Sequence, residues 1–222
     1  MGDIGWSMVV IAGTGLFVGG IFFFIHRKKK AAESALREMA SQRGWSYEPF
    51  REALAWGYRL VSPEWTLESS SRSSGHSVES SQNDVEQVTR LTAPDFILPG
   101  RLLVKPRSGS PRQLSEMELR LAAKAAQMFT GSATAGLEEI QAGSSDLRSR
   151  YQIIGQSGAK GSSIFTPQVE SILLKWKGER PWIEVSPEGM EIRIPGKHLQ
   201  SIVEIRGLVD LAESIQATGK NI

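Results

Sequence analysis

The first hydrophobic feature of the chain is an uninterrupted apolar run over residues 6–25, WSMVVIAGTGLFVGGIFFFI, which contains no charged residue. A helix of this length spans about 30 Å, the thickness of a hydrocarbon core. A cleaved signal peptide has its cations before the apolar run, but here Asp3 precedes it and Arg27, Lys28, Lys29 and Lys30 follow. The pattern therefore predicts a retained transmembrane helix over 6–25, after a short extracytoplasmic tail over 1–5.

The order of charges also predicts an orientation. Because Lys and Arg mark the cytoplasmic side, we expect a single-pass protein of the inner membrane with its N-terminus outside. Arg27, Lys28, Lys29 and Lys30 are the expected membrane-anchoring and topology residues, and the lipid bilayer is the expected partner. Gly15 and Gly19 have the spacing of a helix–helix contact, which would give a homodimer. Glycine is also common in membrane helices, and we favour that interpretation.

After the apolar run, the hydrophobic positions change period several times. A basic juxtamembrane helix is expected over 26–44, followed by a cytoplasmic domain over 45–222. Alternating or β-branched runs predict strands at 45–47, 57–61, 65–68, 85–92, 96–98, 102–104 and 150–154. The 3.6-residue period predicts helices after Leu114, after Thr166 and over 199–216. Pro187-Glu188-Gly189 predicts a turn between strands 182–186 and 190–194.

A serine-rich segment over 69–84 has few apolar residues and predicts a flexible loop or a solvated hairpin. Strands that cluster before helices favour an α+β domain. The expected fold class is therefore α+β, with one N-terminal transmembrane helix followed by a mainly antiparallel sheet packed with helices.

The excess of basic residues is confined to the N-terminal part of the chain. The formal net charge is +2 and the pI about 8.9, yet residues 1–30 alone hold four Lys and Arg side chains against Asp3. The remaining 192 residues are nearly neutral, with 22 basic and 23 acidic groups. This distribution argues against nucleic acid as a partner, because such proteins usually have a basic footprint over the whole domain.

The sequence contains no recognisable catalytic or metal-binding motif. Cysteine is absent, and His26, His76 and His198 lack ligand spacing, so no metal or cofactor is expected. The loop over 155–162 contains glycines, a lysine and serines, but not in the order of a phosphate loop. Ser157 and Lys160 resemble a serine–lysine pair, but the partner motifs of that enzyme class are missing.

A basic stretch over 90–112 leaves two interpretations open. Arg90, Arg101, Lys105, Arg107 and Arg112 would meet phosphates or the inner leaflet if they shared a face. Strand alternation would instead make them the polar face of a sheet, which we favour because the domain is nearly neutral.

The C-terminal half resembles uncharacterised bacterial membrane-anchored proteins with a cytosolic α+β domain of unknown function. The resemblance covers about residues 94–215 and is carried by Asp146–Ile153, Phe165–Val169, Trp182 and Met190–Pro195. It implies one or two N-terminal membrane helices and a cytosolic domain ending in a helix, a hairpin and a final helix. It implies no catalytic residues.

These observations favour a non-enzymatic function. We expect a membrane-anchored interaction or scaffolding module that faces the cytoplasm and binds membrane or cytoplasmic proteins. The alternative is a membrane-tethered enzyme or small-ligand binder with a dispersed site, lined by Arg101, Lys105, Arg107 or His198. A third hypothesis is lipid-surface sensing by residues 27–30 and 101–112.

Overall fold

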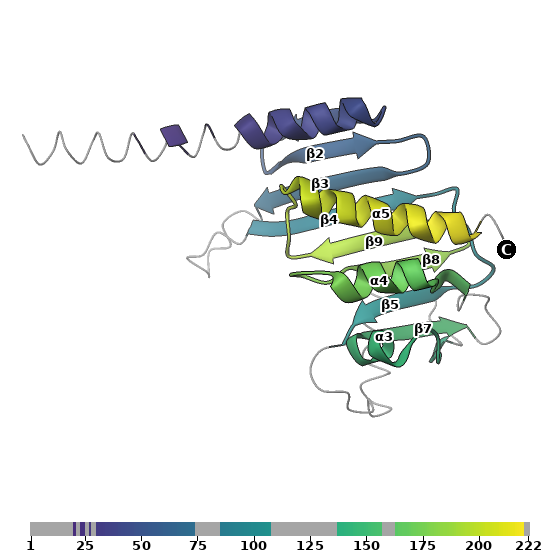
Figure 1. The fold of residues 1–222 in the computed structure, drawn as a ribbon. Coiled ribbons are helices and arrows are strands. Elements are labelled where there is room, and N and C mark those ends of the chain that lie inside the picture. The colour runs from purple at the N-terminus through teal and green to yellow at the C-terminus, as the bar shows by residue number, and fades with distance from the viewer. Residues whose placement is uncertain are drawn as a thin grey trace, which may run out of the picture.

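The computed structural model describes residues 20, 23–24, 27, 30–73, 85–107, 137–156 and 163–219. Their strands form one nine-stranded sheet in the order β1-β2-β3-β4-β9-β8-β5-β7-β6, and every pairing is antiparallel (Figure 1). The strands are β1 (Ser46–Arg51), β2 (Ala55–Val61), β3 (Thr66–Ser73), β4 (Val85–Ala93), β5 (Leu102–Pro106), β6 (Leu137–Glu139), β7 (Tyr151–Gln156), β8 (Trp182–Ser186) and β9 (Gly189–Pro195).

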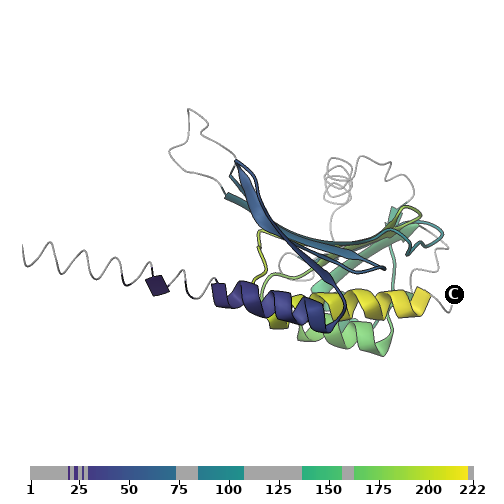
Figure 2. The same ribbon diagram turned by 90° about the horizontal axis from the view of Figure 1, so that it is seen from above.

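Four helices of the described chain lie on one face of this sheet (Figure 2). They are the N-terminal helix over 30–42, α3 (Ser145–Arg150), α4 (Pro167–Lys175) and α5 (Ile202–Gly219). Thr166 caps α4 by accepting a hydrogen bond from Val169 N, and Pro167 occupies the first turn, where a missing N–H costs nothing. The opposite face, called the open face below, is covered by none of these helices (Figure 2).

The core lies between the sheet and the helices. It is built from a row of fully buried side chains that crosses six strands, and each is paired with the next. The row contains Leu67, Leu91, Ile192, Ile183, Val104 and Ile153. Helix α5 contributes Ile205, Leu208, Val209 and Ala212, and all four are fully buried. Burial of about ten such side chains supplies much of the hydrophobic free energy of folding.

The pairing of β4 with β9 joins the two halves of the sheet. Strands β1 to β4 follow one another as neighbours, whereas β5 to β9 form the second half. Thr89 pairs with Ile194 and Ala93 with Met190 across this junction. Because α5 also packs on β4 from the other end of the chain, the halves share one core.

The expected fold class is wrong, because it began with a transmembrane helix. None of the helices within the described ranges is both long and apolar enough to cross a membrane. The 18-residue α5 has the length, but it carries Glu204, Arg206, Asp210 and Glu213. Of residues 6–25, only Gly20, Phe23 and Phe24 are described. The predicted inner-membrane location, with the C-terminal domain in the cytoplasm, stays a prediction.

Three further expectations differ from the structure. Residues 96–98 form no strand, because the chain turns after Ala93. The serine-rich segment begins within β3 rather than in a loop, and Ser69 and Ser71 are buried. Helix α3 and strand β6 have no counterpart in the sequence prediction. The helix predicted after Leu114 lies outside the described residues, as does the rest of the serine-rich segment over 74–84.

Candidate functional site

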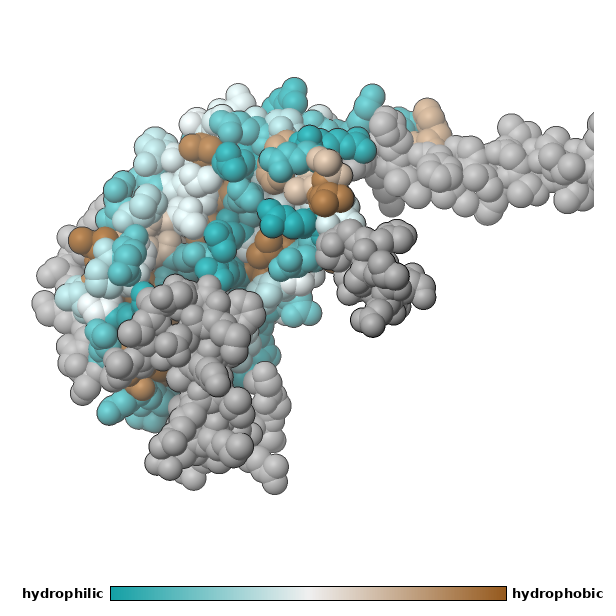
Figure 3. Space-filling view, turned by 180° about the vertical axis from the view of Figure 1, so that it is seen from behind, coloured by the Kyte–Doolittle hydropathy of each residue, from teal (hydrophilic) through white to brown (hydrophobic). Residues whose placement is uncertain are grey.

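The open face of the sheet is polar because the strands alternate. In β9, Met190, Ile192 and Ile194 are buried beneath the helices, while Glu191 and Arg193 lie on the opposite side. The same alternation places Arg90 of β4 and Glu184 of β8 on the open face. Where described residues are visible in Figure 3, hydrophilic side chains predominate over this surface.

Acidic and basic side chains alternate across the open face and neutralise one another. Arg59 contacts Glu48 and Glu68, with its closest oxygen 2.8 Å away on Glu68. Further along, the ion pairs are Arg90–Glu191, Arg193–Glu191, Arg101–Glu184, Arg101–Glu188 and Arg107–Glu139. Such pairs orient side chains and leave little net charge for a polyanion.

The best-buried of these pairs is Arg101 with Glu184, whose side chains are 15% and 18% exposed. Arg101 Nε lies 3.3 Å from Glu184 Oε1. Burial nevertheless raises the pKa of Glu184, against the opposing charge of Arg101. Burial also lowers the pKa of Lys105. These groups lie in the most desolvated part of the open face.

The predicted basic stretch is therefore a sheet face. Arg90 and Arg101 each form an ion pair with a glutamate of a neighbouring strand, and Arg107 pairs with Glu139 of β6. Lys105 shares their face but forms no ion pair within 4.0 Å with any described residue. Arg90, Arg101, Lys105 and Arg107 thus share the polar face of the sheet, and the choice between a solvated face and a phosphate- or leaflet-binding face stays a prediction. Arg112 lies outside the described residues.

Trp182 interrupts the charged surface. It is the first residue of β8, pairs with Arg193 of β9 and is 41% exposed. Alternation in β8 places Trp182 on the same side as Glu184, away from the buried Ile183 and Val185. The sheet thus presents an exposed indole on a surface where most of the charged side chains are ion-paired.

A second polar cluster lies on the helix-covered side. Ser69 Oγ is 2.8 Å from Thr89 Oγ1 and 3.2 Å from His198 Nδ1, and it accepts the Leu199 N–H at 2.9 Å. Tyr58 donates to the Leu199 carbonyl at 2.7 Å. These bonds hold the connection between β9 and α5 on the sheet.

The contact of Ser69 with His198 is the nearest approach to a nucleophile and its base in this cluster. Ser69 is fully buried, and its oxygen is occupied by the Leu199 N–H. A serine nucleophile needs an oxygen that can reach the substrate. We therefore assign Ser69, Thr89 and Tyr58 a structural role, that of satisfying buried backbone groups.

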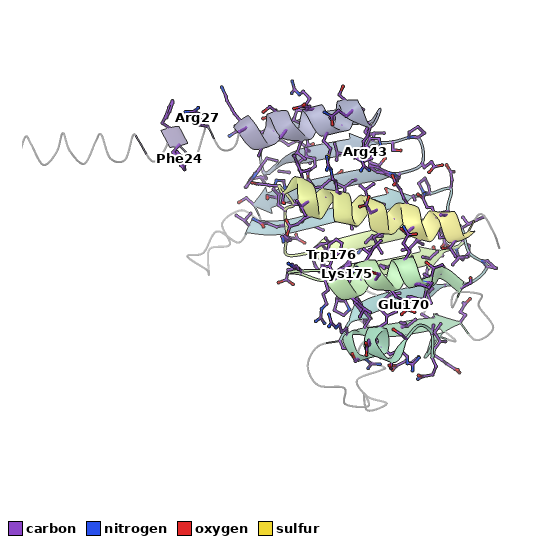
Figure 4. The ribbon with its side chains drawn as sticks, in the orientation of Figure 1. Phe24, Arg27, Arg43, Glu170, Lys175 and Trp176 are labelled. Carbon is purple, nitrogen blue, oxygen red and sulfur yellow. The ribbon has the colours of Figure 1, made fainter. Side chains whose placement is uncertain are left out.

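The remaining predicted site residues lie near the N-terminus. Arg27 and Lys30 are exposed, and Figure 4 labels Arg27 on the N-terminal segment. Gly15, Gly19, Lys28 and Lys29 lie outside the described residues, as do His26 and His76. Within the described ranges, no three His, Cys, Asp or Glu side chains are grouped to hold a metal ion.

Sequence reasoning missed the residues whose role depends on long-range pairing. Ser69 lies in the serine-rich segment and Thr89 in the strand predicted over 85–92, and only the register of β3 with β4 brings them together. For Trp182 the core is the default expectation from sequence, because aromatic residues are usually buried. Strict alternation with Ile183 was the available signal for its exposure.

Comparison with known proteins adds no relative: no family model, curated protein sequence or solved structure matches the chain.

Proposed function

We propose that the protein is an interaction module that binds a partner protein through the open face of its sheet. The supporting observation is Trp182, which is 41% exposed amid ion-paired side chains. Tryptophan is among the residues that most often dominate binding energy at protein interfaces. The surrounding ion pairs resemble the polar rim that encloses such an anchor.

The charge balance of the face favours a protein partner. Glutamates neutralise Arg90, Arg101 and Arg107, so a polyanion or an anionic membrane surface gains little attraction from these three side chains. The enzyme alternative has weaker support, because Ser69, which contacts His198, is fully buried. Anchoring in the inner membrane stays a prediction on which this binding face does not depend.

Site-specific photo-crosslinking tests the proposal. An aromatic photoreactive amino acid replaces Trp182, where it keeps a large aromatic side chain, or Arg90 on the open face, and Val203, which is 79% exposed on α5, serves as the control. We expect the same crosslinked partner from positions 182 and 90 and none from position 203. In the position-90 variant, an added Trp182→Ala substitution should abolish the crosslink.

A crosslink of equal yield from position 203, or none from position 182, would overturn the proposal. The variants also need to retain their fold, which circular dichroism checks. Because Trp182 is partly exposed and lies on the face opposite the buried Ile183, its truncation should leave the melting temperature nearly unchanged.

A further inference from the structure

One buried polar group lacks a hydrogen-bonding partner where the sheet meets α3 and α4. Tyr151, the first residue of β7, is fully buried, and its hydroxyl contacts no partner within the described residues. A buried hydroxyl without a hydrogen-bonding partner destabilises the fold, because it has lost its hydrogen bonds to water. Burial raises the pKa of Tyr151 to about 12, so the phenol is a hydrogen-bond donor at neutral pH.

Two arginines lie beside this phenol. The guanidinium carbon of Arg180 is 6.0 Å from the centroid of the Tyr151 ring. The charges of Arg180 and Arg150 both act to lower the pKa of Tyr151, against the larger effect of burial. The Arg180 guanidinium therefore lies over the Tyr151 ring, and its hydrogen bond to the Arg150 carbonyl brings the two arginine residues together beside the phenol.

Neither guanidinium is neutralised by a carboxylate. Arg150 Nη1 donates to the Leu174 carbonyl at 2.8 Å, and Arg180 Nη1 donates to the Arg150 carbonyl at 3.4 Å. No described carboxylate lies within 4.0 Å of either group. Since a guanidinium has five N–H donors, each arginine retains several for a ligand.

The surroundings are also basic. Arg148, Lys175 and Lys177 flank the two arginines in the chain, against Asp146, Glu170 and Glu179. Lys175 and Trp176 lie together at the end of α4 in Figure 4. The carboxylate of Glu170 accepts the Ser144 N–H at 3.0 Å and so is engaged elsewhere. Five cations against three carboxylates suit a ligand with a double negative charge.

We propose that Arg150, Arg180 and Tyr151 form a binding site for a phosphate group, carried by a phosphomonoester or present as inorganic phosphate. Phosphate accepts hydrogen bonds on several oxygens and matches the fork of arginine. Because the phenol is buried, binding requires the Arg180 side chain, held to a protein acceptor by one 3.4 Å hydrogen bond, to shift and open the path. This site is separate from the open face.

Isothermal titration of the full chain at constant ionic strength tests the site. The probes are inorganic phosphate, glycerol 3-phosphate and acetate. We expect saturable binding of a phosphate probe, about tenfold weaker in Tyr151→Phe, since one hydrogen bond to a charged group is lost. Arg150→Gln and Arg180→Gln should weaken binding at least as much. Arg59→Gln, which removes an exposed arginine of β2, should bind like the wild type.

A melting experiment separates binding from folding. Without phosphate, Tyr151→Phe should melt at or above the wild-type temperature, because it removes an unsatisfied hydroxyl. Phosphate should raise the melting temperature of the wild type and of Arg59→Gln. The increase for Tyr151→Phe should be much smaller.

The tighter of the two phosphate probes identifies the source of the phosphate group. Three results would overturn the site: no saturable binding of either phosphate probe, undiminished binding by Tyr151→Phe, or acetate binding as tightly as phosphate.

Discussion

Glu184 shows how a single side chain on the open face responds to its neighbours. Burial opposes its ionisation more strongly than Arg101 favours it, so its pKa is raised in the folded protein. The exposed Glu188, which shares Arg101, has a lowered pKa because the Ser186 side chain hydrogen-bonds to it. Two glutamates on one arginine therefore respond to pH in opposite directions.

This difference gives a test by pH. For Glu184, the stabilising contribution is complete below the unfolded pKa and is lost as pH rises through the raised folded pKa. Glu184→Gln should therefore gain stability relative to the wild type as the pH increases from 4 to 7. Glu188→Gln should lose relative stability as the pH rises from about 3 to about 5, because hydrogen bonds to the ionised form hold the folded pKa below the unfolded one. Urea denaturation at each pH measures both, and parallel curves would contradict the assignment.

At the residue scale, the sequence indicated the polar character of the candidate site but not its geometry. The alternation of β4 and β5 was readable, and it placed Arg90, Arg101, Lys105 and Arg107 on one face. The ion-pair partners of these side chains could not be read from the sequence, because Glu191 and Glu184 come from strands about 80–100 residues away in the chain. Trp182 and Tyr151 were missed for the same reason: exposure and burial depend on which elements pack nearby.

At the scale of elements, β2 and β3 approach each other so closely at Gly57 that no side chain fits. A Cβ atom there would lie 2.1 Å from the Ser69 carbonyl oxygen and 2.9 Å from Ser70 Cα. Both are backbone atoms and cannot rotate away. Gly57 therefore fixes the spacing of two strands, and one of them carries the Ser69 cluster.

Gly57→Ala should consequently force the strands apart and destabilise the protein by about 3 kcal/mol. Gly155→Ala is a matched control in β7, because its Cβ would press only on the Cδ1 atoms of Ile140 and Leu102, each at 3.3 Å, while the Arg101 carbonyl oxygen at 3.5 Å is at ordinary contact distance. Those side-chain tips can give way, so a loss of about 1 kcal/mol is expected. Equal losses in the free energy of unfolding, measured by urea denaturation, would show that the backbone contact is not the reason why position 57 requires glycine.

The elements themselves were predictable where local signals were strong. The β8–β9 hairpin and helix α4 agree closely with their predicted positions, because Pro187-Glu188-Gly189 and Thr166-Pro167 have defined conformational preferences. Strand β6 has only three residues and α3 has six, too few for a periodic pattern. The polar end of β3 has no hydrophobic alternation, and the buried Ser69 depends on Thr89 of β4 and on Leu199 for its hydrogen-bonding partners.

At the scale of the whole molecule, Leu91 occupies the junction between the two halves of the sheet. It is fully buried and pairs with Leu67 on one side and Ile192 on the other. Its position in the shared core predicts that a destabilising substitution of Leu91 lowers the stability of both halves of the sheet.

Leu91→Ala should destabilise the protein by about 3 kcal/mol through lost burial and a cavity. Hydrogen exchange should show β2 and β7, which belong to different halves, losing protection together. Val203→Ala, at an exposed position of α5, should change neither. Persistent protection of β7 after loss in β2 would mean that the halves unfold independently.

The β4–β9 pairing also has a consequence during synthesis of the chain. Val88 pairs with Pro195, so one edge of β4 stays unpaired until β9, roughly 100 residues later in the chain, has been synthesised. At usual translation rates of about 5–20 residues per second, this interval lasts about 5–20 s. During that time the first four strands carry an unpaired inner edge, a template for intermolecular pairing. The nascent chain should therefore depend on chaperones until its C-terminal hairpin emerges from the ribosome.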